Sequence, residues 1–186
     1  SDPETYKNYI RSRTADNFQV YLANDPSFLP GRTAYLYNFK GPAINVQTAC
    51  STSLVALSQA CDSLLKGESD VGLAGGITIK APQETGYLYY ESGIKSPDGH
   101  CRPFDKHAEG TVFSNGAGVV VLKRLEDAIR DKNRIYSVVK GYGINNDGNL
   151  KVGFTAPSVD GQFKAIRDAQ DAAGVSLEDF DYIEAH

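Results

Sequence analysis

One cysteine stands where the chain is predicted to turn from a strand into a helix, and its type and position suit nucleophilic chemistry. Residues 43–48 are β-prone and follow Gly41-Pro42, so they are predicted to form a buried strand. A helix is predicted to begin after Cys50 and to end at Gly67. The evidence for this helix is apolar residues at helical spacing: Leu54, Leu57, Cys61 and Leu64 or Leu65.

A thiol at this position would lie at the positive end of the helix dipole, which favours thiolate over thiol. Three hydroxyl residues follow Cys50, namely Ser51, Thr52 and Ser53. They are expected to accept hydrogen bonds from the free N–H groups of the first helical turn. Cys50 is therefore a candidate nucleophile. The alternative is a small buried core residue, which describes most free cysteines, and this stretch alone leaves both interpretations open.

A second reactive side chain, His186, follows residues 182–185, which are predicted to form a strand. Catalytic groups in open α/β sheets gather at the carboxyl ends of strands. Two strands of one sheet would therefore bring Cys50 and His186 together across 186 − 50 = 136 residues, and Cys–His pairs are common in nucleophilic catalysis. The alternative is a terminal histidine without a role. His100 and His107 lie in a charged loop and are expected to have surface or structural roles.

Composition limits the class of protein. The 186 residues are 41% hydrophobic and 23% charged, which predicts one globular domain or most of one. A net charge of −4 without a long basic run argues against nucleic-acid binding. The sequence has no apolar run that could span a membrane and begins with polar residues. Three widely spaced cysteines favour a reducing, cytoplasmic setting, and the absence of Cys-x-x-Cys or His-x-x-x-His pairs gives a metal site no support.

The remaining elements alternate in type, which predicts an α/β fold with a central, largely buried sheet. Further strands are predicted at residues 71–77, 116–122 and 136–144, and helices at 16–22, 33–39, 125–131 and from Asp160 to Gly174. Turns are predicted at Asp25-Pro26 and Pro30-Gly31, a long loop at 80–110, and a capped turn at 176–179. The irregular start and the single strand before the last residue suggest a piece of a longer domain.

The segment Thr48-Ala49-Cys50-Ser51-Thr52-Ser53 resembles the nucleophile motif of β-ketoacyl synthases, specifically the ketosynthase domains of modular type I polyketide synthases. Further stretches resemble motifs of that family in the same order: 96–105, 116–125, 145–148, 154–158 and Glu184-Ala185-His186, the last being the start of the motif with the first catalytic histidine. The resemblance extends over nearly the whole chain from Leu22. Residues 113–116 depart from it, because the family often has a second glycine there.

This resemblance implies a thiolase-like layered fold, with helices around mixed β-sheets, incomplete at both ends. Residues 1–186 would be a partial ketosynthase domain: the core of its N-terminal half, from before the nucleophile to the first catalytic histidine. The family's second histidine, a nearby lysine and a C-terminal glycine-rich loop have no counterpart in the sequence. The chain is therefore expected to be inactive or nearly so by itself.

The implied reaction is a decarboxylative Claisen condensation between an acyl thioester on Cys50 and malonyl-acyl carrier protein, giving a 3-oxoacyl-carrier-protein. The Cys50 N–H and His186 would stabilise oxyanions, and Thr155, Ala156 and Pro157 would shape the pocket. No metal and no directly bound cofactor is implied, because substrates arrive on the phosphopantetheine arm of the carrier protein.

The family also implies a homodimer, paired through the strand before Cys50 at residues 44–47, whose free edge would favour association. A carrier protein is usually acidic and would need a local basic patch, for which Lys123, Arg124, Arg130, Lys132 and Arg134 are available. Structural roles are expected for Asn146, Asp147, Cys61 and Cys101. Two alternatives stay open: a non-elongating relative that binds acyl chains or only dimerises, and a thiolase or synthase of the same fold that acts on coenzyme A esters.

Overall fold

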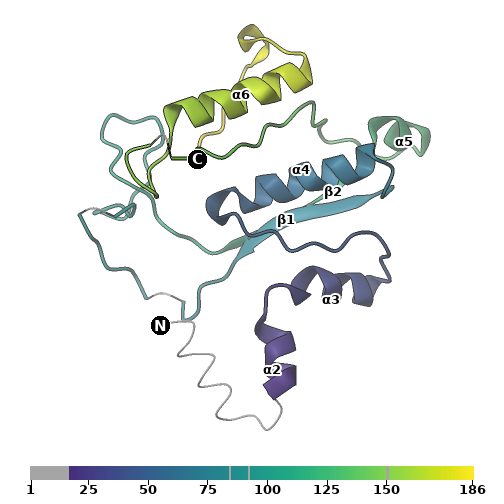
Figure 1. Cartoon of the computed structure of the whole chain (residues 1–186), viewed down its shortest axis with the longest axis horizontal. Helices are drawn as coiled ribbons and strands as arrows, with labels where there is room; N and C mark the ends of the chain where they lie inside the picture. The colour runs from purple at the N-terminus through teal and green to yellow at the C-terminus, as the bar shows by residue number, and fades with distance from the viewer. Residues whose placement is uncertain (1–16, 84, 92, 150) are drawn as a thin grey trace. The chain divides into compact units, whose positions relative to one another are not determined.

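A two-stranded antiparallel sheet with one helix packed on it forms the centre of the first part of the chain (Figure 1). The computed structural model describes residues 17–83, 85–91, 93–149 and 151–186, and it divides after Leu122 into two compact units. In the first unit, β1 (Gly72–Thr78) pairs with β2 (Gly116–Leu122), and α4 (Thr52–Leu65) contacts β1. All three elements were predicted from the sequence. The bounds of the two strands agree with the prediction to within one residue.

The contact between α4 and β1 is close because β1 is rich in glycine. A Cβ atom on Gly72 would lie 3.8 Å from Leu64 Cδ1, and one on Gly76 would lie 3.0 Å from Ser53 Cβ. These two glycines occupy alternate positions of the strand and therefore share the face that α4 covers. Leu64 and Ala74 are the buried hydrophobic residues of this contact, at 4% and 5% exposure. The missing side chains let the backbones approach.

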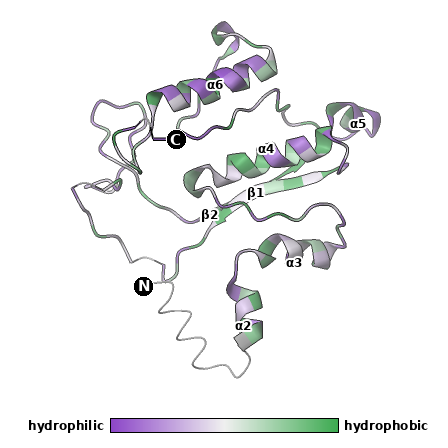
Figure 2. Cartoon of the chain, in the orientation of Figure 1, coloured by the Kyte–Doolittle hydropathy of each residue, from purple (hydrophilic) through white to green (hydrophobic). Residues whose placement is uncertain are grey.

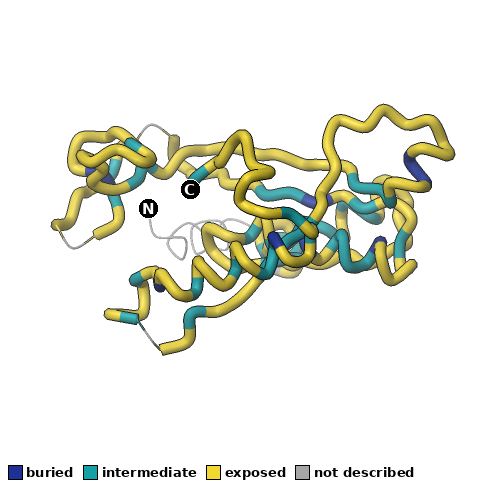
Figure 3. The backbone as a smooth tube through the Cα atoms, turned by 90° about the horizontal axis from the view of Figure 1, so that it is seen from above, coloured by how far each residue is buried: buried dark blue, intermediate teal, exposed yellow. Residues whose placement is uncertain are grey.

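The strands are coloured white to green, the apolar half of the hydropathy scale, in Figure 2, and most of the described chain is coloured exposed in Figure 3. The face of the sheet away from α4 carries exposed apolar side chains. Val119 and Val121 are 69% and 71% exposed, and Leu73 and Ile77 are also exposed. The expectation of a largely buried sheet is therefore wrong for this chain. Within the described residues, only three hydrophobic residues are buried: Leu64, Ala74 and Ala128.

Among the described residues, α2 (Asn17–Asn24) and α3 (Phe28–Tyr37) come before α4 along the chain. They confirm the helices predicted at residues 16–22 and 33–39. Residue 16 itself lies outside the described residues. The turn predicted at Pro30-Gly31 is wrong, because α3 begins earlier and contains both residues in its first turn. Proline is tolerated there because the first N–H groups of a helix have no intrahelical partner. Asn38, with φ 55°, ends α3 in the left-handed conformation.

The second unit contains α5 (Leu125–Arg130) and the longer α6 (Val159–Ala173). Both confirm predicted helices, but α6 begins at Val159, one residue before the predicted start at Asp160, and its N-terminal cap is Ser158. The Ser158 hydroxyl accepts a hydrogen bond of 3.2 Å from the Gly161 N–H, and Gly174 ends the helix with φ 63°. The short 3-10 helix η2 (Leu177–Asp179) has the predicted capping box, in which Asp179 accepts from Ser176.

Three predicted strands, at residues 43–48, 136–144 and 182–185, form no ladder within the described residues. The prediction of a buried strand before Cys50 is also wrong on burial, because Ile44 is 62% exposed. The second segment packs along α6 instead: Cβ atoms on Gly141 and Gly143 would lie 2.4 Å and 2.2 Å from carbonyl oxygens of that helix. The predicted loop after β1 is confirmed in its described residues, and an isolated β-bridge joins Lys95 to Thr111.

Candidate active site

A strained turn presents Cys50 at the start of α4. The residue lies in a 3-10 turn, η1 (Ala49–Ser51), and its neighbour Ala49 has φ 54°. A left-handed conformation is uncommon for a residue other than glycine and costs about 1 kcal/mol or more, so such residues occur where the surrounding structure holds them. The turn leaves Cys50 exposed. The interpretation of Cys50 as a buried core residue is therefore wrong for this chain.

The hydroxyl residues around Cys50 brace this turn. Thr52 Oγ1 donates to the Ala49 carbonyl at 2.7 Å and accepts from the Thr48 N–H at 3.0 Å. Ser51 Oγ donates to the Thr48 carbonyl at 2.9 Å and makes no side-chain capping bond to α4. The expectation that these hydroxyls would satisfy the N–H groups of the first helical turn is therefore wrong for Ser51 and Thr52. Their bonds fix the backbone that positions Cys50.

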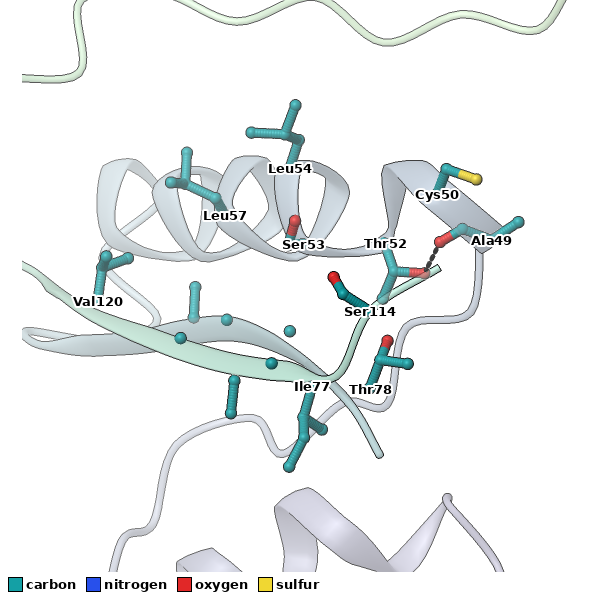
Figure 4. A pocket seen from close by; sticks show the side chains of 16 residues that line it. Ala49, Cys50, Thr52, Ser53, Leu54, Leu57, Ile77, Thr78, Ser114 and Val120 are labelled. Carbon is teal, nitrogen blue, oxygen red and sulfur yellow. Dashed lines mark hydrogen bonds between the residues drawn. The ribbon is translucent and has the colours of Figure 1, made fainter. Parts of the chain in front are cut away.

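Cys50 lies at one end of an open hollow between the first turns of α4 and the sheet (Figure 4). The hollow has a volume of about 630 Å³. Its walls are backbone and small or apolar side chains: Ala49, Thr52, Ser53, Leu54, Leu57, Ala74, Gly75, Gly76, Ile77, Thr78, Ser114, Gly116, Ala117, Gly118 and Val120. The sequence did not indicate this hollow, although the glycines of both strands were a signal for close approach or open space.

His186 and residues 155–157 belong to the second unit, and Cys50 belongs to the first. His186 is exposed, as are Thr155 and Pro157. The Ala156 N–H donates to the Gly153 carbonyl at 3.1 Å, so these residues form a turn just before α6. The two strands that were expected to bring Cys50 and His186 together are not formed within the described residues. The approach of the two side chains stays a prediction.

The predicted turn at 145–148 is confirmed, and it is tied to the start of α6. The Gly148 N–H donates to Asn146 Oδ1 at 2.8 Å, and Gly148 has φ 61°. Asp147 Oδ2 accepts from the Ser158 N–H at 3.3 Å, and Asn145 Nδ2 donates to the Gly161 carbonyl at 2.6 Å. These bonds confirm structural roles for Asn146 and Asp147.

The loop after β1 contains a polar cluster that sequence reasoning missed. Ser96 is fully buried, at 0% exposure, and donates to Asp98 Oδ1 at 2.8 Å. Arg102 donates to both oxygens of Asp98, at 3.1 and 2.6 Å. The hydrogen bonds from Arg102, and then from Ser96, hold the pKa of Asp98 well below its ordinary range. His100 contributes its backbone N–H to Asp98, while its side chain is 69% exposed.

The other two cysteines differ from each other. A hydrogen bond from the Thr111 hydroxyl, and then one from the Val112 N–H, lower the pKa of the exposed Cys101. Burial, and then the charge of Asp62, raise the pKa of Cys61. Cys61 lies in α4 and is half-buried, as expected from its place on the inward face.

The basic residues around α5 are mostly engaged in ion pairs. Lys123 pairs with Asp131, and both Arg124 and Arg130 pair with Asp127. Arg134 lies over the ring of Tyr136, with its guanidinium carbon 4.8 Å from the ring centroid. Within the described residues, no three His, Cys, Asp or Glu side chains group as metal ligands, and no helix is long and apolar enough to cross a membrane.

Comparison with known proteins identifies the family. Residues 2–128 match the β-ketoacyl synthase N-terminal domain, and residues 136–186 match its C-terminal domain. The chain is 46% identical over 171 residues to a phenolphthiocerol/phthiocerol polyketide synthase of Mycobacterium tuberculosis strain H37Rv, a match that covers 92% of this chain and 12% of that protein. It is 42% identical over 185 residues to the hybrid PKS-NRPS synthetase TAS1 of Gloeophyllum trabeum, covering 98% of this chain and 12% of that protein.

Solved structures similar to this chain belong to the same family as these relatives. Ketosynthase twelve from the bacillaene polyketide synthase in Bacillus amyloliquefaciens has a TM-score of 0.90 and 36% identity, over 97% of this chain and 32% of that one. The ketosynthase from module 6 of the bacillaene synthase of Bacillus subtilis 168 has a TM-score of 0.75 and 40% identity, over 86% of this chain and 28% of that one. The chain therefore belongs to the β-ketoacyl synthase family, as part of a ketosynthase domain of the modular polyketide synthase type with a thiolase-like α/β fold.

Proposed function

We propose that this chain carries the acyl-accepting cysteine of a ketosynthase that catalyses the decarboxylative Claisen condensation of an acyl thioester with malonyl-acyl carrier protein. The product is a 3-oxoacyl-carrier-protein of polyketide or fatty-acid-type biosynthesis. The observation that carries this proposal is the placement of Cys50, exposed on a strained turn at the start of α4 and at the end of a hollow. Membership of the β-ketoacyl synthase family supports it.

Acylation is the first step. The Cys50 thiolate attacks the carbonyl carbon of the incoming acyl thioester, so that a new S–C bond forms and the donor S–C bond breaks. The donor thiolate leaves and takes up the proton that Cys50 lost. The Cys50 backbone N–H is assigned as a donor to the oxyanion that develops on the acyl carbonyl.

Condensation follows on a malonyl unit. The bond between its carboxylate and the α-carbon breaks, carbon dioxide leaves, and the electron pair remains as an enolate. The enolate attacks the carbonyl of the Cys50 thioester, so that a C–C bond forms and the Cys50 S–C bond breaks. His186 is assigned as one donor to the enolate oxygen, and losing one such donor costs about 3 kcal/mol of transition-state stabilisation.

The proposed partner is an acyl carrier protein that presents both substrates on phosphopantetheine. Residues 44–47 are the proposed dimer edge. Two observations support this: Ile44 is 62% exposed, and the segment has no strand partner within the described residues. Thr155, Ala156 and Pro157 are proposed to shape the pocket near the thiol.

The test uses the intact protein that contains this chain, an acyl-thioester donor and mass spectrometry. An acyl adduct is expected on Cys50, absent in Cys50→Ala and retained in Cys61→Ser. An adduct that maps to Cys61 and survives Cys50→Ala contradicts the proposal.

Release of carbon dioxide from malonyl-carrier protein separates condensation from passive acyl binding. We expect His186→Ala to reduce condensation about 100- to 1000-fold while leaving the Cys50 adduct in place. An intact protein that acquires the adduct but never releases carbon dioxide or a 3-oxoacyl product favours the non-elongating alternative.

A further inference from the structure

Phe104 is exposed on a turn whose backbone conformation does not suit an aromatic residue. The turn runs from Arg102 to Asp105 and is closed by a hydrogen bond of 3.3 Å from the Asp105 N–H to the Arg102 carbonyl. The ring of Pro103 fixes its φ at about −65°, and Phe104 has φ 61°, so the turn is of type II. The third position of such a turn favours glycine, because a Cβ atom there is strained. Phe104 occupies this position and is 81% exposed.

A polar cluster holds this turn in place. Arg102 donates to both carboxylate oxygens of Asp98, at 3.1 and 2.6 Å. Asp98 also accepts a hydrogen bond from the hydroxyl of Ser96, which is fully buried. At the other end of the turn, Asp105 Oδ1 accepts from the backbone N–H two residues later, at 2.7 Å. The turn is therefore fixed at both ends, and it presents Phe104 as a preformed apolar knob.

The surroundings of this knob are typical of the centre of an interface. An aromatic side chain that is 81% exposed gains little from burial, so burial in this chain does not offset the strain at Phe104. Strained residues cluster where they bind something. The nearest residues along the chain are charged, namely Arg102, Asp105 and Lys106. One apolar anchor surrounded by a polar rim is a common arrangement of binding hot spots.

The magnitudes of the opposing effects indicate what kind of partner the knob fits. Burying one phenylalanine side chain favours a bound state by about 10- to 100-fold. Joining two separate molecules costs about 1000-fold or more at the usual standard state. One knob therefore does not hold a separate molecule. It suffices for a pocket in the same protein, because connected segments do not bear that cost again.

We infer that Phe104 docks into an apolar pocket in a part of the same protein that this chain does not include. Ketosynthase twelve of the bacillaene synthase matches 97% of this chain with a TM-score of 0.90, but the match covers only 32% of that ketosynthase. A protein of that length has further structure that can supply the pocket. The inference does not depend on the reaction at Cys50.

The test compares Phe104→Gly and Phe104→Ala in the intact protein that contains this chain, by denaturant titration. Both changes remove the aromatic ring, but only glycine also relieves the strain. We expect the equilibrium constant for unfolding to rise about tenfold in Phe104→Gly and further in Phe104→Ala, because the lost burial outweighs the relief of strain. Phe104→Leu keeps an apolar side chain and should lose less than either.

Asn38→Gly is the matched control. Asn38 is also exposed and left-handed, with φ 55°, but its replacement removes no apolar side chain. The control should leave the unfolding constant unchanged or lower it. A Phe104→Gly variant that is as stable as the unmodified protein, or more stable, overturns the inference, because relief of strain is then the only effect. A loss of stability that depends on protein concentration places the pocket on a second copy, and this also overturns it.

Discussion

The three cysteines of the chain lie in three different environments, and these should separate their chemistry. Cys50 is exposed on the strained turn before α4, Cys61 is half-buried within that helix, and Cys101 is exposed beside Thr111. The sulfur of Cys101 lies 3.3 Å from the Thr111 hydroxyl. A thiolate there is stabilised by a neighbouring donor without any helix terminus. Cys101 is therefore a second thiol that alkylating reagents should modify.

We predict that Cys101 reacts with iodoacetamide at lower pH than Cys61. The pKa of Cys101 is lowered by the Thr111 hydroxyl and then by the Val112 N–H, whereas burial and the charge of Asp62 raise the pKa of Cys61. The lower pKa means more thiolate at a given pH, and the thiolate is the reactive form. Peptide mass spectrometry over a pH series measures the midpoint of each reaction.

Thr111→Val removes the hydroxyl and should move the Cys101 midpoint to higher pH, while Thr111→Ser should retain it. Equal midpoints in Thr111→Val and the unmodified protein contradict the assignment. A reactive Cys101 would also compete with Cys50 for the acyl donor in the labelling experiment above. The variant Cys101→Ser removes this competing thiol.

At the level of helices and strands, the second unit depends on a close contact between an extended segment and α6. Gly141 and Gly143 lie against the helix, and their Cβ positions are blocked by the carbonyl oxygens of Ala169 and Ala165. Backbone atoms cannot rotate away as side chains do. The two glycines therefore allow the segment to pack where a strand partner was expected.

We predict that Gly143→Ala destabilises the protein by about 1–3 kcal/mol, because the added Cβ would lie 2.2 Å from the Ala165 carbonyl oxygen and force the segment off the helix. Thermal unfolding of the intact protein measures the loss. Gly153→Ala is the matched control, since a Cβ on Gly153 meets no atom within 4 Å. Equal stability of the two variants would show that the segment does not pack on α6 as described.

For the molecule as a whole, the main unexplained feature is the exposed apolar face of the sheet, which no described part of the chain covers. Val119 and Val121, which are 69% and 71% exposed, lie on the face that α4 does not cover. Burying one such side chain contributes about 1.5–3 kcal/mol, so a run of them is expected to be covered in the working protein. The chain spans 12% of the curated relatives and 32% and 28% of the solved ketosynthases described above, which is compatible with a cover from elsewhere in a longer protein.

We predict that Val121→Lys lowers the stability of the intact protein by about 2 kcal/mol, because a covered face must then bury an ammonium group or separate from its cover. Val152→Lys is the control: Val152 is 100% exposed in an irregular segment, and the change should stay within about 0.5 kcal/mol. Thermal unfolding midpoints compare the two. If both variants match the unmodified protein, this face is open to solvent in the working protein.

Elements with local signals could be predicted from the amino-acid sequence alone. The helix after Cys50 follows from apolar spacing, β2 from an unbroken apolar run, and the end of α6 from Gly174. The family could also be predicted in this way, because its motifs are short and keep their order along the chain.

Features that depend on contacts between separate segments could be recognised only from the tertiary structure. A strand exists only where another strand pairs with it, so residues 43–48, 136–144 and 182–185 are not strands here although their composition favours them. The backbone strain at Ala49, the buried Ser96 with its polar partners, and the hollow beside Cys50 arise between residues distant in sequence or from the geometry of one turn. Periodicity and composition describe single segments, and such features depend on how segments meet.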